Sequence, residues 1–159
     1  MPNYFTPKDF AKLQEKIRKT EAKLDEAKLQ IGEACNQGSD TFHDNFPYEE
    51  ALRQVAFWSR RLQEFIDLQC DAQIVYPSEE TIRVAISTIV TIEDVATHEE
   101  ETYRIASFGI AIYSDEKGVV SYNSPLGQCL LGAWKGDIRT LRLGEKIRQL
   151  RVKKIQSGA

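Results

Sequence analysis

The stretch 6–38 decides the first half of the fold, and it reads TPKDFAKLQEKIRKTEAKLDEAKLQIGEACNQG. Thr6 is a favourable N-cap, Pro7 fits the first helical position, and Asp9 lies near the positive end of the expected helix. Apolar and small residues then recur every three or four positions, namely Phe10, Leu13, Ile17, Thr20, Leu24, Ala27, Ile31 and Ala34. This heptad pattern predicts a coiled-coil helix of about 45 Å, at 1.5 Å per residue.

A second helix is expected to begin near Pro47, because proline suits the first helical position and Glu49 and Glu50 favour the first turn. Its stripe consists of Leu52, Val55, Ser59, Leu62, Ile66 and Gln69. One antiparallel register, which pairs Ala34 with Leu52 and Ile17 with Gln69, gives every member of the second stripe a partner on the first. The pattern therefore predicts a helical hairpin with its tip at residues 39–46. Such a hairpin could also serve only as a spacer or a dimerisation element.

The composition is that of a globular protein: 159 residues, of which 42% are hydrophobic and 28% are charged. No apolar run approaches the roughly 18 residues of a membrane span, and the N-terminus lacks the features of a secretion signal. Three cysteines, Cys35, Cys70 and Cys129, leave one unpaired in any scheme, which suits a reducing compartment. We therefore expect a cytoplasmic protein with no membrane partner.

The segment 76–78 breaks the helical heptad pattern, and beyond it the apolar residues recur with a period of two, so domains are predicted at 1–75 and 76–159. Alternation over 82–86 and 88–92 predicts strands, and the acidic stretch 93–101 is expected to be a solvated hairpin edge. A short apolar helix is expected at 126–130, and closing strands at 140–143 and 150–155. Together these segments predict an α+β fold, a coiled-coil hairpin followed by a sheet domain with one short helix.

The net charge of −3, from 24 acids and 21 bases, excludes binding of nucleic acid by bulk attraction. The charges are nevertheless separated along the chain. Eight bases and two acids lie between Lys135 and Lys154, whereas segment 40–50 has four acids and neither lysine nor arginine. The basic end could be a solvated surface or a face that binds a polymer.

The predicted tip, with its flanks, reads GSDTFHDNFPY over residues 38–48. Asp40 and Asp44 could coordinate Mg²⁺ if a second macromolecule supplied the remaining ligands, or they could be ordinary turn residues. Aromatic side chains at the end of an isolated hairpin have no core to enter, so they predict a tip that inserts into a partner. The expected tip contacts are Phe42, His43, Asn45, Phe46 and Tyr48. No zinc spacing, phosphate loop or nucleophile motif indicates an autonomous active site.

This order of parts resembles the Gre family of bacterial transcript-cleavage elongation factors. The segment Asp44-Asn45-x-x-Tyr48 is similar to the tip of that family. The stretch VSYNSPLG at 120–127, followed by LLG at 130–132 and GD at 136–137, is similar to a motif series in its C-terminal domain. The resemblance implies that the sheet domain is FKBP-like.

The resemblance also implies a mechanism, with bacterial RNA polymerase as the partner. The C-terminal domain would dock at the rim of the secondary channel through Asn123, Ser124 and Pro125, and the hairpin would pass down the channel. Asp40 and Asp44 would help to hold a catalytic Mg²⁺ shared with the polymerase active site, which cuts the 3′ end of a backtracked transcript. The chain itself would then be a monomer of the transcription machinery and no enzyme, and it would meet the RNA only indirectly.

The tip departs from the family pattern Gly-Asp-Leu-x-Glu-Asn, in which the two acids are three residues apart. Here Asp44 occupies the glutamate position, and Asp40 lies four residues before it. An alternative function is therefore a noncleaving regulator that occupies the channel and inhibits the polymerase. A third reading is a prolyl isomerase whose aromatic pocket would be formed by Tyr103, Tyr122 and Trp134.

Overall fold

The computed structural model describes residues 1–37, 46–79 and 81–158, and it divides into two compact units. The hairpin unit is Leu13–Cys70, and the sheet unit combines Met1–Lys12 with Asp71–Ala159. The expected boundary at residue 75 therefore differs from the observed division, in which the first 12 residues group with the sheet. The reason is a pairing between distant segments. Strand β1 (Asn3–Phe5) runs parallel to β2 (Ala72–Ile74).

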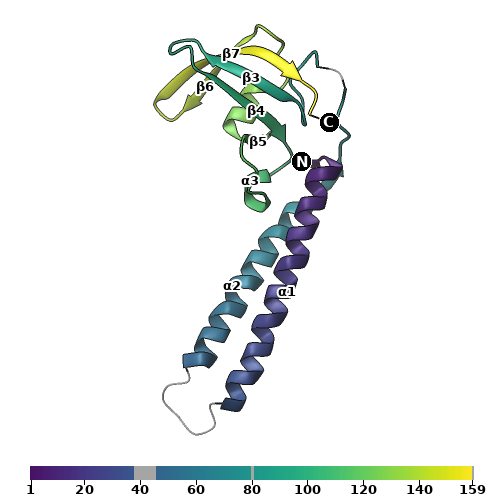
Figure 1. Cartoon of the computed structure of the whole chain (residues 1–159), viewed down its shortest axis with the longest axis vertical. Helices are drawn as coiled ribbons and strands as arrows, with labels where there is room; N and C mark the ends of the chain where they lie inside the picture. Colours follow the sequence, from purple (N-terminus) through teal and green to yellow (C-terminus); the bar gives the residue numbers. More distant parts are fainter. Residues whose placement is uncertain (38–45, 80, 159) are drawn as a thin grey trace. The chain divides into compact units, whose positions relative to one another are not determined.

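The hairpin unit consists of helix α1 (Pro7–Gln37), from residue 13 onwards, and helix α2 (Phe46–Gln69) (Figure 1). The predicted stripe on α1 is confirmed, because most of its members are buried: Leu13, Ile17, Thr20, Leu24, Ala27 and Ala34. No helix in the described part of the chain combines the length and the apolar character that crossing a membrane requires.

The stripe predicted on α2 is correct only in part, since Val55, Leu62, Ile66 and Gln69 are half-buried but its other two members are exposed. Leu52 is 43% exposed and Ser59 is also exposed, whereas Ala51 and Phe65 are buried and Trp58 is half-buried. These last three residues are spaced by heptads. Large aromatic side chains gain more from burial than a serine does, so the helix turns this row inward instead of the predicted one.

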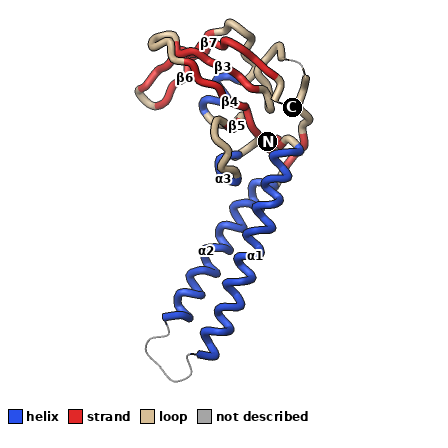
Figure 2. Tube along the Cα trace, in the orientation of Figure 1, coloured by secondary structure: helices blue, strands red, loops and turns tan. Residues whose placement is uncertain are grey.

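The sheet unit contains a five-stranded sheet in the order β5-β4-β3-β7-β6 (Figure 2). All neighbours are antiparallel except β4 and β5. The strands are β3 (Ile89–Asp94), β4 (Glu100–Ala106), β5 (Val119–Ser121), β6 (Ile138–Leu143) and β7 (Lys146–Gln156), with short helices α3 (Ile110–Tyr113) and α4 (Pro125–Leu130). The predicted α+β class is therefore confirmed. The core beneath the sheet includes Val90, Ile92, Ile105, Leu130 and Leu150.

The strand predicted over 82–86 is wrong. The backbone N–H of Val84 donates to the carbonyl oxygen of Ala133 at 2.9 Å, and that of Gly132 donates back to Val84 at 2.7 Å. A single bridge joins Arg83 to Trp134. The segment thus satisfies its backbone on the loop after α4, which leaves it outside the sheet despite its alternating pattern.

The acidic turn between β3 and β4 is less solvated than expected at its first two residues. Glu93 and Asp94 are only 8% and 7% exposed. Lys153 reaches Glu93 at 3.0 Å, and Arg148 reaches Asp94 at 2.9 Å. These hydrogen bonds are the main reason why the pKa values of both carboxyl groups lie below their ordinary range. Part of the basic end predicted from the sequence is therefore neutralised within the sheet.

The first turn of α1 is fixed to the sheet unit by the buried side chain of Asp9. Its carboxylate accepts hydrogen bonds from the hydroxyl of Ser107 at 2.7 Å and from Arg104 at 3.3 Å. Thr6 caps the same turn by accepting from the N–H of Asp9 at 3.2 Å, as the sequence predicts. Glu116 forms ion pairs with both Arg104, at 3.0 Å, and Lys12, at 2.5 Å. A carboxylate with no exposed surface is thus supplied with several donors.

Burial alone would raise the pKa of Asp9, but the hydrogen bonds from Ser107 and Arg104 outweigh it, and the net effect lowers the pKa below its ordinary value. A carboxyl group of this kind stabilises the fold above its unfolded pKa. The contribution is lost as the pH falls through the lower pKa of the folded state.

We expect Phe65→Ala to lower the free energy of unfolding by about 3–5 kcal/mol, because Phe65 is almost fully buried between the helices. The matched variant Leu52→Ala should cost less than about 1 kcal/mol, since that residue is 43% exposed and loses less burial than Phe65. Urea unfolding followed by helical circular dichroism measures both. Equal losses would contradict the observed packing and favour the stripe predicted from the sequence.

We expect Asp9→Asn to destabilise the protein at pH 7 by roughly 3 kcal/mol, the order of cost for breaking a buried ion pair. The gap between the parent and the variant should narrow as the pH falls below about 4, the range in which a free aspartate gains its proton. Urea unfolding at pH 7, 5 and 3 tests this, with the exposed Asp25→Asn as control. A gap that stays constant with pH would contradict the assigned role of the charge.

Candidate functional site

The tip residues predicted to bind metal, Asp40 and Asp44, lie outside the described residues, as do Phe42, His43 and Asn45. The other two expected tip contacts belong to the first turn of α2, where Phe46 is 66% exposed and Tyr48 is half-buried. Within the ranges that the structure describes, no three acidic, histidine or cysteine side chains gather closely enough to hold a metal ion. The assignment of the Mg²⁺ ligands therefore stays a prediction.

Two further acids counted with the tip have structural partners on α2. Arg53 reaches Glu49 at 3.8 Å and Glu50 at 3.1 Å. Glu50 also accepts a hydrogen bond from Gln54 at 3.0 Å, and these contacts, Gln54 foremost, lower its pKa. Glu49 and Glu50 are thus engaged in contacts within the helix. Asp40 and Asp44 stay the candidates for metal binding at the tip.

The three residues predicted to bind polymerase lie in the turn formed by residues 121–127, which joins β5 to α4. Ser124 is the N-cap of α4, since its hydroxyl accepts from the N–H of Gly127 at 3.0 Å and donates to the carbonyl oxygen of Ser121 at 2.7 Å. Pro125 follows at the first position of the helix and is exposed. This is the arrangement that the sequence Ser-Pro-Leu-Gly favours.

Asn123 is exposed, but its side chain is fixed by hydrogen bonds to its amide oxygen. The N–H of Gly109 donates to the Asn123 amide oxygen at 3.4 Å, and the hydroxyl of Ser121 also contacts that oxygen. Ser121 itself donates to the carbonyl oxygen of Ser107 at 2.9 Å, so the turn is tied to the loop before α3. The structure thus brings Asn123, Ser124 and Pro125 together on one fixed turn with two of them facing solvent.

Gly127 allows this turn to fold. A Cβ atom at this position would lie 2.9 Å from the Cα of Tyr122 and closer still to the carbonyl oxygen of Ser121. No side chain can be accommodated at such distances from the backbone, so only glycine fits where α4 crosses the end of β5. The Gly in the motif is therefore explained by close packing of the turn.

Tyr122 reaches from this turn to the N-terminal strand. Its hydroxyl accepts a hydrogen bond from the N–H of Tyr4 at 3.1 Å, and the two rings lie 6.0 Å apart. Both rings line a groove of about 470 Å³ that also includes Tyr76 and Leu131. Sequence patterns offered no signal of this contact, because Tyr4 lies outside every periodic segment.

The aromatic pocket expected for a prolyl isomerase does not form, because Tyr103, Tyr122 and Trp134 do not line one common cavity. Trp134 stacks on Arg83, with 4.3 Å between the guanidinium carbon and the ring centre, and lines a different hollow from that of Tyr122. Tyr103 donates its hydroxyl to Glu101 at 2.9 Å, and burial is the main cause of its raised pKa. The three rings therefore serve separate contacts.

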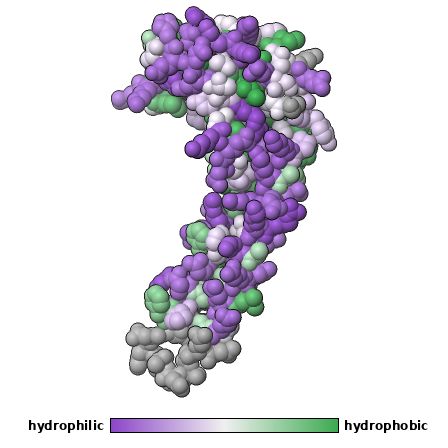
Figure 3. Space-filling model, in the orientation of Figure 1, coloured by the Kyte–Doolittle hydropathy of each residue, from purple (hydrophilic) through white to green (hydrophobic). Residues whose placement is uncertain are grey.

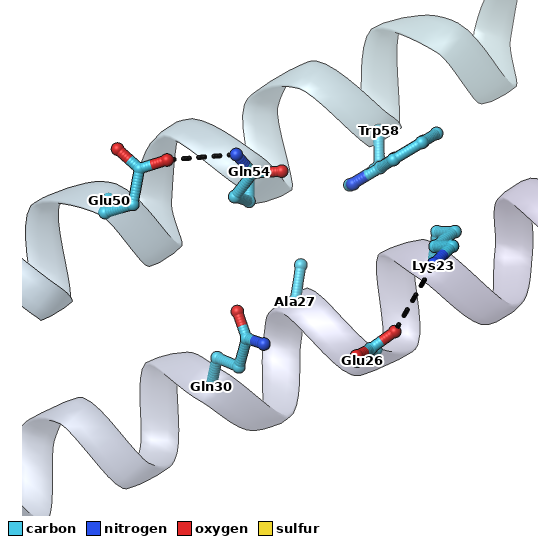
Figure 4. A pocket seen from close by; sticks show the side chains of 7 residues that line it. All are labelled: Lys23, Glu26, Ala27, Gln30, Glu50, Gln54 and Trp58. Atoms are coloured by element: carbon cyan, nitrogen blue, oxygen red, sulfur yellow. Dashed lines mark hydrogen bonds and ion pairs between the residues drawn. The ribbon is translucent and has the colours of Figure 1, made fainter.

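The hairpin unit contains a polar hollow of about 360 Å³ between its helices, where Ala27 lies opposite Gln54 and Trp58 (Figure 4). The side chain of Ala27 is too small to fill the space between the helices at the level of Trp58. The carboxylates at its margin are engaged with neighbours, Glu26 with Lys23 at 4.0 Å and Glu50 with Gln54. Hydrophilic side chains dominate the visible face of this unit (Figure 3). The hollow is thus a packing feature of the hairpin.

Comparison with known proteins agrees with this geometry. Residues 79–157 match the family model described as "Transcription elongation factor, GreA/GreB, C-term". This range contains the 121–127 turn and the strands that carry it.

Two curated relatives extend the similarity beyond this range. The transcription elongation factor GreA of a Nitratiruptor species is 32% identical over 132 residues, which cover 81% of this chain and 80% of that protein. GreA of Thermotoga neapolitana is 31% identical over 134 residues, 84% of this chain and 83% of that protein. Among solved structures, the GreA factor homolog 1 (Gfh1) protein of Thermus thermophilus is 25% identical, with 99% of this chain and 100% of that chain covered and a TM-score of 0.45. The chain belongs to the GreA/GreB family of transcription elongation factors.

Proposed function

We propose that this elongation factor binds RNA polymerase through the 121–127 turn and stimulates cleavage of backtracked transcripts through its hairpin tip. The observation that carries the proposal is the construction of that turn. Asn123 and Pro125 are exposed, while Ser121, Ser124 and Gly127 fix the backbone beneath them. A surface with a fixed backbone loses little conformational entropy when it binds, and this favours specific docking.

The hairpin unit is long enough to carry its tip into a channel of the polymerase. At 1.5 Å per residue, the 31 residues of α1 and the 24 residues of α2 correspond to about 46 Å and about 36 Å. Two helices of this length can carry the acids between them into a narrow channel, which a loop alone could not do without losing its shape. Asp40 and Asp44 lie in the segment that connects the two helices.

In this proposal Asp40 and Asp44 contribute carboxylate oxygens, the ligand type that Mg²⁺ prefers. The ion, once shared with the polymerase active site, would activate a water molecule for phosphodiester cleavage. The chain would only orient ligands and would have no cleavage activity without the polymerase.

A second candidate is a regulator that occupies the channel without cleavage, and the tip sequence favours it at one point. Asp44 is one methylene shorter than the glutamate of the family pattern, and Asp40 lies four residues before it instead of three. An error of about 1 Å in positioning a catalytic group can cost roughly 10²-fold in rate. The two candidates differ only in what the tip does after entry.

Cleavage should be measured on a stalled, backtracked elongation complex of the cognate polymerase. We expect the protein to accelerate release of the 3′ RNA fragment, and Asp44→Ala and Asp40→Ala each to lower that rate by at least tenfold. The control is Asp25→Ala, which removes an exposed carboxylate from the middle of α1. A parental rate for Asp44→Ala would refute the metal role. Slower nucleotide addition with no added cleavage at any Mg²⁺ concentration would support the noncleaving regulator.

Docking should be measured separately, as the affinity of the protein for the polymerase in a direct binding assay. We expect Asn123→Ala and Pro125→Ser to weaken binding by about tenfold, since each removes an exposed contact from the fixed turn. Gln128→Ala is the matched control, because Gln128 is exposed one turn further along α4. Unchanged affinity for both turn variants would place the polymerase contact elsewhere on the chain.

A further inference from the structure

Strand β6 forms one edge of the five-stranded sheet (Figure 1). It is paired on one side only, with β7, and in the described part of the chain no segment pairs with its other side. The opposite edge is formed by β5, which has three residues against the six of β6. A long unpaired edge presents N–H and C=O groups that can extend the sheet by one more strand.

The register identifies the groups that face outward. Ile138 pairs with Arg151 and Leu143 with Lys146, without a shift in between. The N–H of Val152 donates to the carbonyl oxygen of Asp137 at 2.9 Å. Because antiparallel pairs alternate, the backbone groups of the odd-numbered residues of β6 point toward β7. Those of Ile138, Thr140 and Arg142 point to the open edge.

The edge lacks most of the devices that block strand addition. β6 contains no proline, and the one register shift of β7 occurs on its other side, against β3. Exposed aliphatic side chains also accompany the edge: Ile138, Leu143 and the neighbouring Ile147 are 50%, 48% and 62% exposed. The remaining protection is charge, which deters some partners and attracts others.

The charge on this edge is positive. Arg139 and Arg142 are the only ionisable residues of β6, and Lys146 opens β7 beside them. Arg139 reaches Asp137 at 3.8 Å, so the positive charge of the edge rests mainly on Arg142 and Lys146. The bases further along β7 are also engaged, Arg148 with Asp94 and Lys153 with Glu93. The open edge therefore combines unpaired backbone, exposed aliphatic side chains and positive charge.

We propose that β6 binds an extended segment of a partner protein, rich in acidic and aliphatic residues, as an added strand. Successive side chains of a strand alternate between its two faces, so the acids of an alternating segment would face Arg142 on one face of β6 and the aliphatic residues would cover Leu143 on the other. A second copy of this chain fits less well, because its own β6 strand would bring Arg139 and Arg142 and no acid to the same edge. The inference goes beyond the proposed function and uses neither the 121–127 turn nor the tip.

The test uses the whole protein and a fluorescein-labelled peptide of eight alternating Glu and Val residues, followed by fluorescence anisotropy. Thr140→Pro removes an outward N–H without touching the ladder to β7, and it should weaken binding at least tenfold. The matched control Thr140→Ala keeps the N–H and should bind within twofold of the parent. Arg142→Glu should also weaken binding at least tenfold, and a Lys-Val peptide should bind less tightly than the Glu-Val peptide.

NMR of the parent protein locates the bound peptide independently. This measurement tests the proposal even if Thr140→Pro fails to fold. The peptide should slow amide exchange at Ile138, Thr140 and Arg142 and leave the N–H groups facing β7 unchanged. Protection confined to another surface, or no binding up to 1 mM peptide at low salt, would overturn the proposal. So would tighter binding of a 12-nucleotide oligouridine that Thr140→Pro leaves intact, or a dimer in sedimentation that Thr140→Pro dissociates.

Discussion

The buried contact between Asp9 and Arg104 is the constraint on which the rest of the sheet unit depends. It joins residues 95 positions apart, and it fixes the first turn of α1 against β4 and the loop that begins with Ser107. A carboxylate with no exposed surface is costly unless donors surround it, so its removal would leave Arg104 partly buried beside Glu116 alone. The start of the hairpin helix is thus an integral part of the sheet unit.

The same principle applies to three further acids of the sheet unit. Asp9, Glu93, Asp94 and Glu116 each have a basic partner within 3.3 Å. These ion pairs neutralise charges that appear free when only the sequence is considered. In each case hydrogen bonding to the partner favours the ionised carboxylate. The net charge of −3 is therefore a poor guide to what a partner would meet on the surface.

What the sequence predicted correctly is local in origin. The stripe of α1 repeats over successive heptads, and the 121–127 turn is determined within seven residues by a cap, a proline and a glycine. The failures concern choices between distant partners. Alternation at 82–86 could not reveal that Val84 would bond to Ala133, and nothing near Tyr4 pointed to Tyr122. On α2 the predicted stripe was misplaced at Ser59, because Trp58 is adjacent to it and periodicity alone did not weigh their sizes.

The basic end of the chain shows why sheet order matters for function. From the sequence, the bases of β6 and β7 form one cluster, which could be solvated or could bind a polymer. The structure separates them: Arg148 and Lys153 are paired with acids of β3, whereas Arg142 lies on the edge strand beside exposed aliphatic residues. A phosphate backbone would be expected to use all of these charges together. Because Arg148 and Lys153 are already paired with acids, and Arg142 lies on an open backbone edge, an acidic strand matches this surface better than a nucleic acid does.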